Sequence, residues 1–275
     1  MTQGAWVKIL VASTLVAPVA ARGSSVFPEP SCLKSSVDFW EKVYTTWGRD
    51  ELVVHNTETF EVYSVTAIPP ASEKNKRRKA VDEAVQRARA VLPAEAKERV
   101  RAQNGVRERF AEGVRLAKKY DEPVREALRA SGVPAELALL PHVESSFQPN
   151  ARSKVGARGV WQVMPATLRT YFGRKAKVAK LSDVGFATTV AVEILKDNYS
   201  HLGSWPLAVK AYHTGLGRIK KAVRQTGSTD VCVITSTFED KAYKFASRNY
   251  YSQLIATIRI LEKKDEHDKH GPRHD

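Results

Sequence analysis

Apolar residues recur at intervals of three or four along most of the chain, which is the spacing of helices that bury one face. Val37, Trp40 and Tyr44 follow it and predict a short helix within residues 35–48. A charged helix is predicted from residue 73 to about 92, and Pro93 begins another. Further helices are predicted over residues 106–120, 124–130, 134–144, 165–172, 181–202, 206–212, 219–224 and 249–261. The predicted fold class is therefore mainly α.

Residues 51–68 follow a different pattern, in which apolar and polar residues alternate as in a half-buried strand. Two short strands are predicted there, with His55-Asn56-Thr57 as the turn between them. Pro69-Pro70 ends this region. We expect a small β-hairpin that packs on the helical part of the molecule and carries no chemistry.

The first residues resemble a secretion signal. Lys8 precedes an apolar run over residues 9–17, and small residues at 19–21 allow cleavage after Ala21. The run is too short to span a bilayer, and no other stretch reaches the roughly 18 apolar residues that a spanning helix needs. We expect an exported protein, periplasmic or secreted, with no transmembrane segment in the mature chain. A buried N-terminal helix is the alternative.

The charge and the cysteines add further limits. The formal net charge is +14 and the sequence pI is near 9.8, which suits an anionic partner such as nucleic acid or an acidic cell wall. The chain has no recognisable nucleic-acid-binding module, so charge alone supports that alternative. Cys32 and Cys232 could form one disulfide bridge in an exported protein. The sequence shows no cluster of cysteine and histidine at ligand spacing, so no metal site is predicted.

Glu144 is the main candidate for chemistry. Leu137, Leu140 and Glu144 lie at i, i+3 and i+7, so the carboxyl group shares the buried face of a helix. Burial disfavours the ionised form and raises the pKa above its usual value of about 4.3, as a general acid requires at neutral pH. The alternative is a buried glutamate that is paired with Arg152 or Arg158.

The residues around Glu144 form a long motif, Glu144-Ser145-Ser146-Phe147-x-Pro149-x-Ala151-x-Ser153-x-x-Gly156-Ala157-x-Gly159-x-Trp161-Gln162-x-Met164-Pro165-x-Thr167. In residue type and spacing it resembles the catalytic signature of lytic transglycosylases, bacterial peptidoglycan-cleaving enzymes related to goose-type lysozyme. Residues 203–215 are similar to the second signature of that family. Residues 245–251 resemble the segment that supplies a tyrosine to the cleft. The resemblance spans about residues 104–261 and is closest to the membrane-bound transglycosylase D subgroup.

The resemblance implies a lysozyme-like transglycosylase domain with a helical N-terminal extension. The expected boundaries are a signal peptide at 1–21, the extension at 22–103, the catalytic domain at 104–262 and a charged, disordered tail at 263–275. The implied partners are peptidoglycan glycan strands and other cell-wall enzymes, without nucleic acid and without a cofactor. Glu144 would act alone, first as acid and then as base, and would leave a 1,6-anhydro end on N-acetylmuramic acid. A hydrolytic muramidase of the goose-type lysozyme kind and an inactive peptidoglycan-binding protein are the alternatives.

The resemblance also implies a set of substrate-binding residues around Glu144. These are Ser145, Ser146, Gly159, Gln162, Met164, Tyr212, His213 and Tyr250. Tyr250 is expected to hydrogen-bond to Glu144, although packing is an alternative role for the tyrosines and for Met164. His213 departs from the asparagine usual in the family, so it would add a titrating group to the cleft and alter the subsite preference.

Overall fold

The computed structural model describes residues 26–270, with side chains through Lys264. The predicted signal peptide lies outside these residues. The α-helices are α1 (Lys34–Thr45), α2 (Lys74–Val91), α3 (Ala94–Lys97), α4 (Arg107–Ala117), α5 (Asp121–Ala130), α6 (Leu140–Ser145), α7 (Pro165–Phe172), α8 (Val184–Leu202), α9 (Trp205–Thr214), α10 (Leu216–Thr226), α11 (Val231–Thr237) and α12 (Phe245–His270). Short 3-10 turns are η1 (Ser31–Leu33), η2 (Ala135–Leu139) and η3 (Val178–Ser182). The prediction of a mainly α fold is confirmed.

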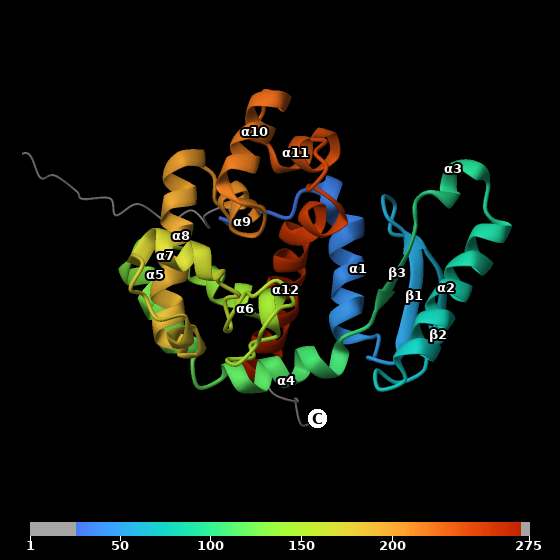
Figure 1. Cartoon of the computed structure of the whole chain (residues 1–275), viewed down its shortest axis with the longest axis horizontal. Coiled ribbons are helices and arrows are strands. Elements are labelled where there is room, and N and C mark those ends of the chain that lie inside the picture. Colours follow the sequence, from blue (N-terminus) through green and yellow to red (C-terminus); the bar gives the residue numbers. More distant parts are fainter. Residues whose placement is uncertain (1–25, 271–275) are drawn as a thin grey trace, which may run out of the picture.

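A small antiparallel sheet lies at one end of the molecule with α2 and α3 beside it (Figure 1). Its strands are β1 (Glu51–Asn56), β2 (Val62–Ala67) and β3 (Val100–Asn104), in the order β2-β1-β3. The predicted hairpin of β1 and β2 is confirmed, with its turn a few residues later than expected. β3 was not predicted, since only a helix beginning at Pro93 was expected in this part of the chain. That helix ends at Lys97, since residues 100–104 pair with β1 instead.

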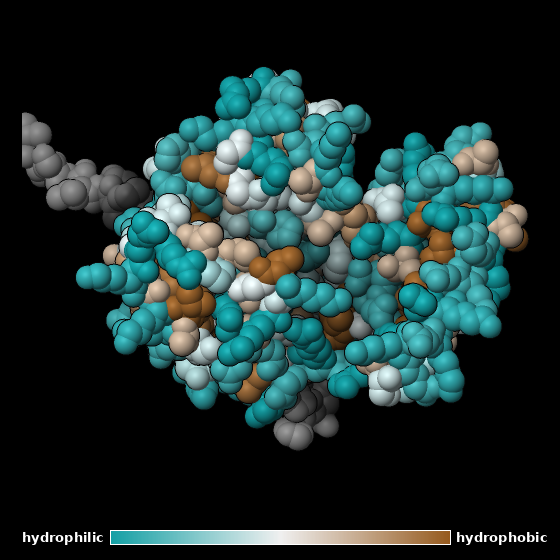
Figure 2. Space-filling model, in the orientation of Figure 1, coloured by the Kyte–Doolittle hydropathy of each residue, from teal (hydrophilic) through white to brown (hydrophobic). Residues whose placement is uncertain are grey.

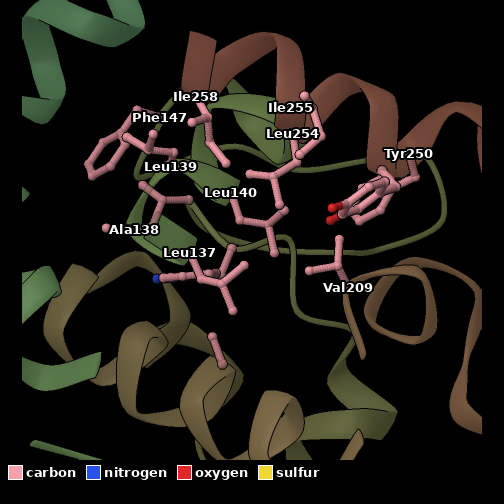
Figure 3. Close-up of a cluster of buried hydrophobic side chains, with 14 of the residues drawn as sticks. Leu137, Ala138, Leu139, Leu140, Phe147, Val209, Tyr250, Leu254, Ile255 and Ile258 are labelled. Carbon is pink, nitrogen blue, oxygen red and sulfur yellow. The ribbon is translucent and has the colours of Figure 1, made fainter. Parts of the chain in front are cut away.

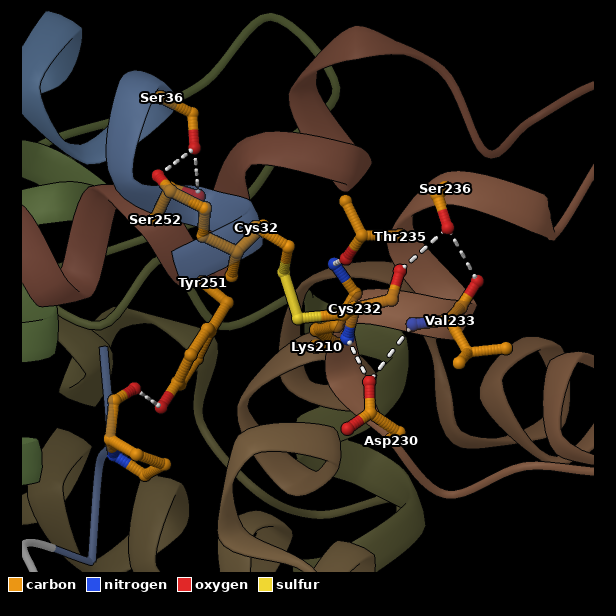
Figure 4. The surroundings of a disulfide bond; sticks show 12 residues. Cys32, Ser36, Lys210, Asp230, Cys232, Val233, Thr235, Ser236, Tyr251 and Ser252 are labelled. Atoms are coloured by element: carbon orange, nitrogen blue, oxygen red, sulfur yellow. Dashed lines mark hydrogen bonds between the residues drawn. A yellow bond between two sulfur atoms is a disulfide. The ribbon is translucent and has the colours of Figure 1, made fainter. Parts of the chain in front are cut away.

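The two ends of the described chain lie side by side, because α1 packs along α12 (Figure 1). The disulfide between Cys32 and Cys232 joins the N-terminal segment to α11, with the two Cα atoms 6.1 Å apart (Figure 4). This confirms the bridge that the two cysteines suggested. The hydroxyl of Ser36 also donates to that of Ser252 over 2.7 Å. The N-terminal segment is therefore packed against α12 and bonded to both α11 and α12.

Helix α12 is longer than the predicted 249–261, since it runs from Phe245 to His270. The expectation of a disordered tail is therefore wrong for residues 263–270, and residues 271–275 lie outside the described part. An ion pair stabilises the added part of α12, because the ammonium group of Lys263 lies 2.8 Å from the carboxylate of Glu41 on α1. None of the helices described between residues 26 and 270 is long and apolar enough to cross a membrane.

Candidate active site

The element that carries Glu144 is shorter and more irregular than the sequence predicts. Pro134 precedes the 3-10 turn η2, and Pro141 lies in the first turn of α6, where its missing N–H is tolerated. Leu137 and Leu140 are fully buried against α12 (Figure 3), whereas Glu144 is half-buried. The two leucines fix the buried face of this segment, and the carboxyl group lies at its end.

Glu144 has a specific partner on α12. The hydroxyl of Tyr250 donates a short hydrogen bond to Oε1 of Glu144, as the sequence resemblance implied. Burial raises the pKa of Glu144 to about 7, and the bond from Tyr250 acts in the opposite direction. No described residue forms an ion pair with Glu144, so the alternative pairing with Arg152 or Arg158 is not found. The carboxyl group is thus partly protonated at neutral pH.

The chain reverses direction directly after Glu144. Ser146 and Phe147 both adopt left-handed backbone conformations, with φ of 52° and 54°. Gly113 of α4 approaches this turn so closely that a Cβ atom there would lie 2.4 Å from the carbonyl oxygen of Ser146. Arg109, also on α4, donates to the carbonyl of Ser145 over 3.2 Å. Helix α4 therefore packs against this turn and stabilises it.

Ser145, the last residue of α6, and Gly159 in the following loop both take part in packing this segment. The buried Ser145 hydroxyl donates to the carbonyl of Val160 over 2.9 Å and accepts from the N–H of Gln148 over 3.0 Å. Gly159 has φ +74°, and a Cβ atom there would lie 1.9 Å from the carbonyl of Leu181. Both residues therefore shape the loop, and the substrate contacts predicted for them stay a prediction.

Gln162 and Met164 follow in the same loop. The side-chain amide of Gln162 donates to the carbonyl of Gly159 over 2.8 Å, and Gln162 has φ 48°. It also lines the pocket in front of Glu144. Met164 caps α7 and is 38% exposed, so core packing does not explain it. It is not among the residues that line the same pocket.

The remaining predicted residues lie on α9 and α12. The hydroxyl of Tyr212 donates to the carbonyl of Trp161 over 2.8 Å, so it holds the loop between α6 and α7. The ring of His213 stacks on that of Tyr250, with centroids 4.4 Å apart and planes 20° apart. Burial of its inner side and the nearby charge of Lys210 lower the pKa of His213. A lowered pKa favours the neutral ring near pH 7, and the expected change in subsite preference stays a prediction.

An open pocket of about 560 Å³ lies in front of Glu144. Hydrophilic residues dominate the surface of the molecule in Figure 2, and the lining of this pocket has the same character. The lining residues are Arg109, Glu144, Ser145, Gln148, Pro149, Asn150, Ala151, Arg152, Ser153, Lys154 and Gln162. Three of them are cationic and only Glu144 is acidic, so the pocket suits a polar ligand that carries negative charge.

Sequence reasoning missed several of these residues. Arg109 lies in the helix predicted over residues 106–120, to which no chemistry was assigned, and its proximity to Glu144 depends on how α4 packs. Gln148 and Asn150 lie inside the recognised motif, at positions that the family pattern leaves variable. Within the residues whose side chains are described, no group of three or more His, Cys, Asp or Glu residues could hold a metal ion.

Comparison with known proteins shows what the part of the chain around this site is similar to. Residues 122–232 match the model of the Transglycosylase SLT domain. Over 133 residues the chain is 35% identical to membrane-bound lytic murein transglycosylase D of Escherichia coli (strain K12). That match covers 46% of this chain and 29% of the relative. The chain thus resembles lytic transglycosylases over this part and spans less than a third of the length of that relative.

Two further similarities were found. The chain is 33% identical over 96 residues to a putative tributyltin chloride resistance protein of Alteromonas sp. (strain M-1), covering 33% of this chain and 45% of that protein. The crystal structure of the 70 kDa soluble lytic transglycosylase SLT70 from Escherichia coli aligns with 53% of this chain and 24% of its own. The TM-score of that alignment is 0.45 and the sequence identity 19%.

Proposed function

We propose that this protein is a peptidoglycan lytic transglycosylase that cleaves the β-1,4 bond between N-acetylmuramic acid and N-acetylglucosamine. The observation that carries the proposal is the state of Glu144, whose pKa is raised to about 7 and whose carboxyl group has a tyrosine partner but no ion pair among the described residues. Such a group can release a proton near neutral pH and take one back. The SLT domain match over residues 122–232 supports the same class of reaction.

In the first step, protonated Glu144 gives its proton to the glycosidic oxygen, and the bond from that oxygen to C1 of the muramic acid breaks. The 2-acetamido group of the same sugar stabilises the positive charge that develops on C1. The hydroxyl of Tyr250 donates to Glu144 and so stabilises the carboxylate that this step creates. The ring of His213 packs on Tyr250 and limits its movement.

In the second step, the Glu144 carboxylate removes the proton from the C6 hydroxyl of the muramic acid. The freed oxygen then bonds to C1 and closes the 1,6-anhydro ring. Glu144 is protonated again, so the reaction is balanced without water. Most glycoside hydrolases instead use two carboxyl groups, of which the second activates water or attacks the sugar. Two other acids of the domain are engaged elsewhere, since Asp183 caps α8 and Glu193 lies 4.0 Å from Lys196.

The proposed substrate also agrees with the charge of the pocket. Arg109, Arg152 and Lys154 line it, and muramic acid and its peptide stems carry carboxylates. We also propose that the catalytic domain spans residues 104–262 and that the protein acts outside the cytoplasm, in the periplasm or after secretion. The disulfide between Cys32 and Cys232 supports export, because such bridges persist in oxidising compartments.

Digestion of purified peptidoglycan sacculi tests the reaction. We expect soluble muropeptides with 1,6-anhydro ends by mass spectrometry, and a yield lowered about 10²- to 10⁴-fold for Glu144→Gln. Glu193→Gln, an exposed acid on α8, is the matched control and should keep full activity. Products heavier by one water would identify a muramidase. Retention on sacculi with equal product yield from wild type and Glu144→Gln would identify a binding protein.

A further inference from the structure

Lys210 is a fully buried lysine on α9, and no described carboxylate pairs with it. Its ammonium group donates instead to three neutral oxygens, which belong to two other helices. These are the hydroxyl of Thr235 at 3.0 Å and the carbonyls of Ser247 at 3.3 Å and Arg248 at 3.2 Å. Burying an ammonium group without an acidic partner costs free energy, which these three hydrogen bonds partly offset. The same bonds join α9 to α11 and α12.

The surroundings of Lys210 explain how the charge is accommodated. Thr235 lies in the last turn of α11, and the C-terminal end of a helix attracts cations. Arg248 binds the same end, since it donates to the carbonyls of Thr235 at 2.8 Å and Phe238 at 3.1 Å. The Lys210 ammonium also lies 5.3 Å from the centre of the Tyr243 ring. Burial and the charge of Arg248 lower the pKa of Lys210 to about 7.

The contacts of Lys210 lie one helical turn from Tyr250, the residue that donates to Glu144. Ser247 and Tyr250 are three residues apart on α12, just as Lys210 and His213 are three residues apart on α9. Helices α9 and α12 are therefore in contact at two places. One is the Lys210 ammonium, and the other is the stacked pair of rings of His213 and Tyr250. Tyr250 in turn donates to Glu144. A shift at the first contact would therefore move the tyrosine at the second.

The third helix of this junction is itself anchored. Cys232 lies in α11 one turn before Thr235, and its disulfide to Cys32 fixes α11 to the N-terminal segment (Figure 4). Figure 4 shows the Lys210 side chain beside Thr235 and close to this bridge. Lys210 thus connects α9 and α12 to a helix whose position is already set covalently.

We propose that Lys210 is a positioning residue, which joins α9 and α11 to the first turn of α12 and thereby holds the Tyr250 hydroxyl on Glu144. This inference rests on the proposed function for its kinetic effect. Lys210 has its hydrogen bonds to Thr235, Ser247 and Arg248 and is not among the residues that line the pocket, so it acts through Tyr250. It differs from a purely structural residue in that its loss should affect catalysis more than stability.

A double-mutant cycle with Lys210→Met and Tyr250→Phe tests the inference. Methionine keeps the length and apolar body of the side chain but removes the ammonium group. We expect Lys210→Met to lower kcat about tenfold, with KM changed less than about twofold, because roughly one hydrogen bond to a charged group is weakened. In the Tyr250→Phe background the same substitution should have no further effect on kcat. Lys221→Met is the matched control, since Lys221 binds Asp240 rather than α12.

Stability gives a second readout. Replacing a buried charge by an apolar side chain of similar volume is often neutral or stabilising, so the melting temperature of Lys210→Met should be unchanged or higher. An equal loss of kcat in both backgrounds would overturn the inference, because Lys210 would then act independently of Tyr250. An unchanged kcat would overturn it as well. If the methionine variant does not fold, Lys210→Gln carries the same cycle.

A measurement without turnover separates this inference from the proposed function. The pKa of Glu144 can be followed by carbon NMR of its carboxyl group in the wild type and in the variants. The bond from Tyr250 lowers that pKa, so Lys210→Met should raise it, and should leave it unchanged in the Tyr250→Phe background. If the wild type forms no anhydro products but the NMR shift is found, the proposed function fails and the positioning role stands. If anhydro products form without the shift, the positioning role fails.

Discussion

The hydroxyl of Tyr250 donates a hydrogen bond to the carboxyl group of Glu144, although the two residues are 106 positions apart in the chain. Glu144 lies in the last turn of the short helix α6, and Tyr250 lies in the second turn of α12. Their contact depends on the packing of η2 and α6 against α12, in which Leu137 and Leu140 are fully buried (Figure 3). The hydrophobic core thus brings together the two groups on which the proposed reaction depends.

Substituting Tyr250 with phenylalanine should raise the pKa of Glu144, because the hydroxyl stabilises the ionised carboxylate. We expect kcat to fall about tenfold and the loss of activity at high pH to begin at a higher pH than in the wild type. The pH–rate profile on soluble glycan strands measures both effects. Tyr251→Phe is the control, since Tyr251 donates to the carbonyl of Pro28 and should leave the profile unchanged.

Substituting Glu144 with glutamine should change stability as well as activity. The pKa of Glu144 is about 7 in the folded protein and 4.5 in its ordinary environment. Between these values the folded state holds a proton that the unfolded state has lost, so the free energy of unfolding of the wild type falls as pH rises. Glutamine does not titrate, so the variant should be more stable than the wild type above about pH 7.

Thermal melts at about pH 4 and about pH 8 check this prediction. The two proteins should melt together at the lower pH, where Glu144 is protonated in both states. At the higher pH the glutamine variant should melt at the higher temperature. Equal melting temperatures at both values would mean that the Glu144 carboxylate is well solvated, and that it lacks the raised pKa of a general acid.

Much of the helical framework could be predicted from the sequence, because amphipathic spacing reflects burial directly. Helix α7 was predicted with the bounds that the structure has, since Pro165 begins it and Phe172 precedes a glycine. Strand β3 was missed, because residues 100–104 have no clear alternation and become a strand only by pairing with β1. Helix α11 was missed too, since it is short and is fixed by the cap at Asp230 and by the disulfide.

The candidate site was predicted unevenly. Glu144 and Tyr250 belong to motifs, so a resemblance could identify them even though nothing local brings them together. Lys210 and Arg109 could not be found in this way, because each acts through contacts with distant segments. In the sequence, Lys210 stands out only as a charged residue within an otherwise apolar helix. Its partners on α11 and α12 become evident only in three dimensions.

Substituting Gly113 with alanine should disturb the turn after Glu144. A Cβ atom at this position would lie 2.4 Å from the carbonyl oxygen of Ser146. That oxygen belongs to the backbone, so it cannot move aside as the end of a flexible side chain could. We expect a loss of about 1–3 kcal/mol in the free energy of unfolding, together with reduced activity. Gly217→Ala in α10 is the matched control, because nothing lies within 4 Å of its Cβ position. That control should be neutral or slightly stabilising in denaturant unfolding.

Removing the disulfide should destabilise the whole molecule, because the bridge closes a loop of 200 residues and anchors α11. We expect the double variant Cys32→Ser, Cys232→Ser to lose about 2–4 kcal/mol in the free energy of unfolding, measured by urea denaturation. Reductant should destabilise the wild type by a similar amount and leave the double variant unaffected. Since α11 also receives the contacts of Lys210 and Arg248, kcat should fall in the double variant even under conditions where it is fully folded. Unchanged kcat in the folded variant would show that these two side chains hold α11 in place without the bridge.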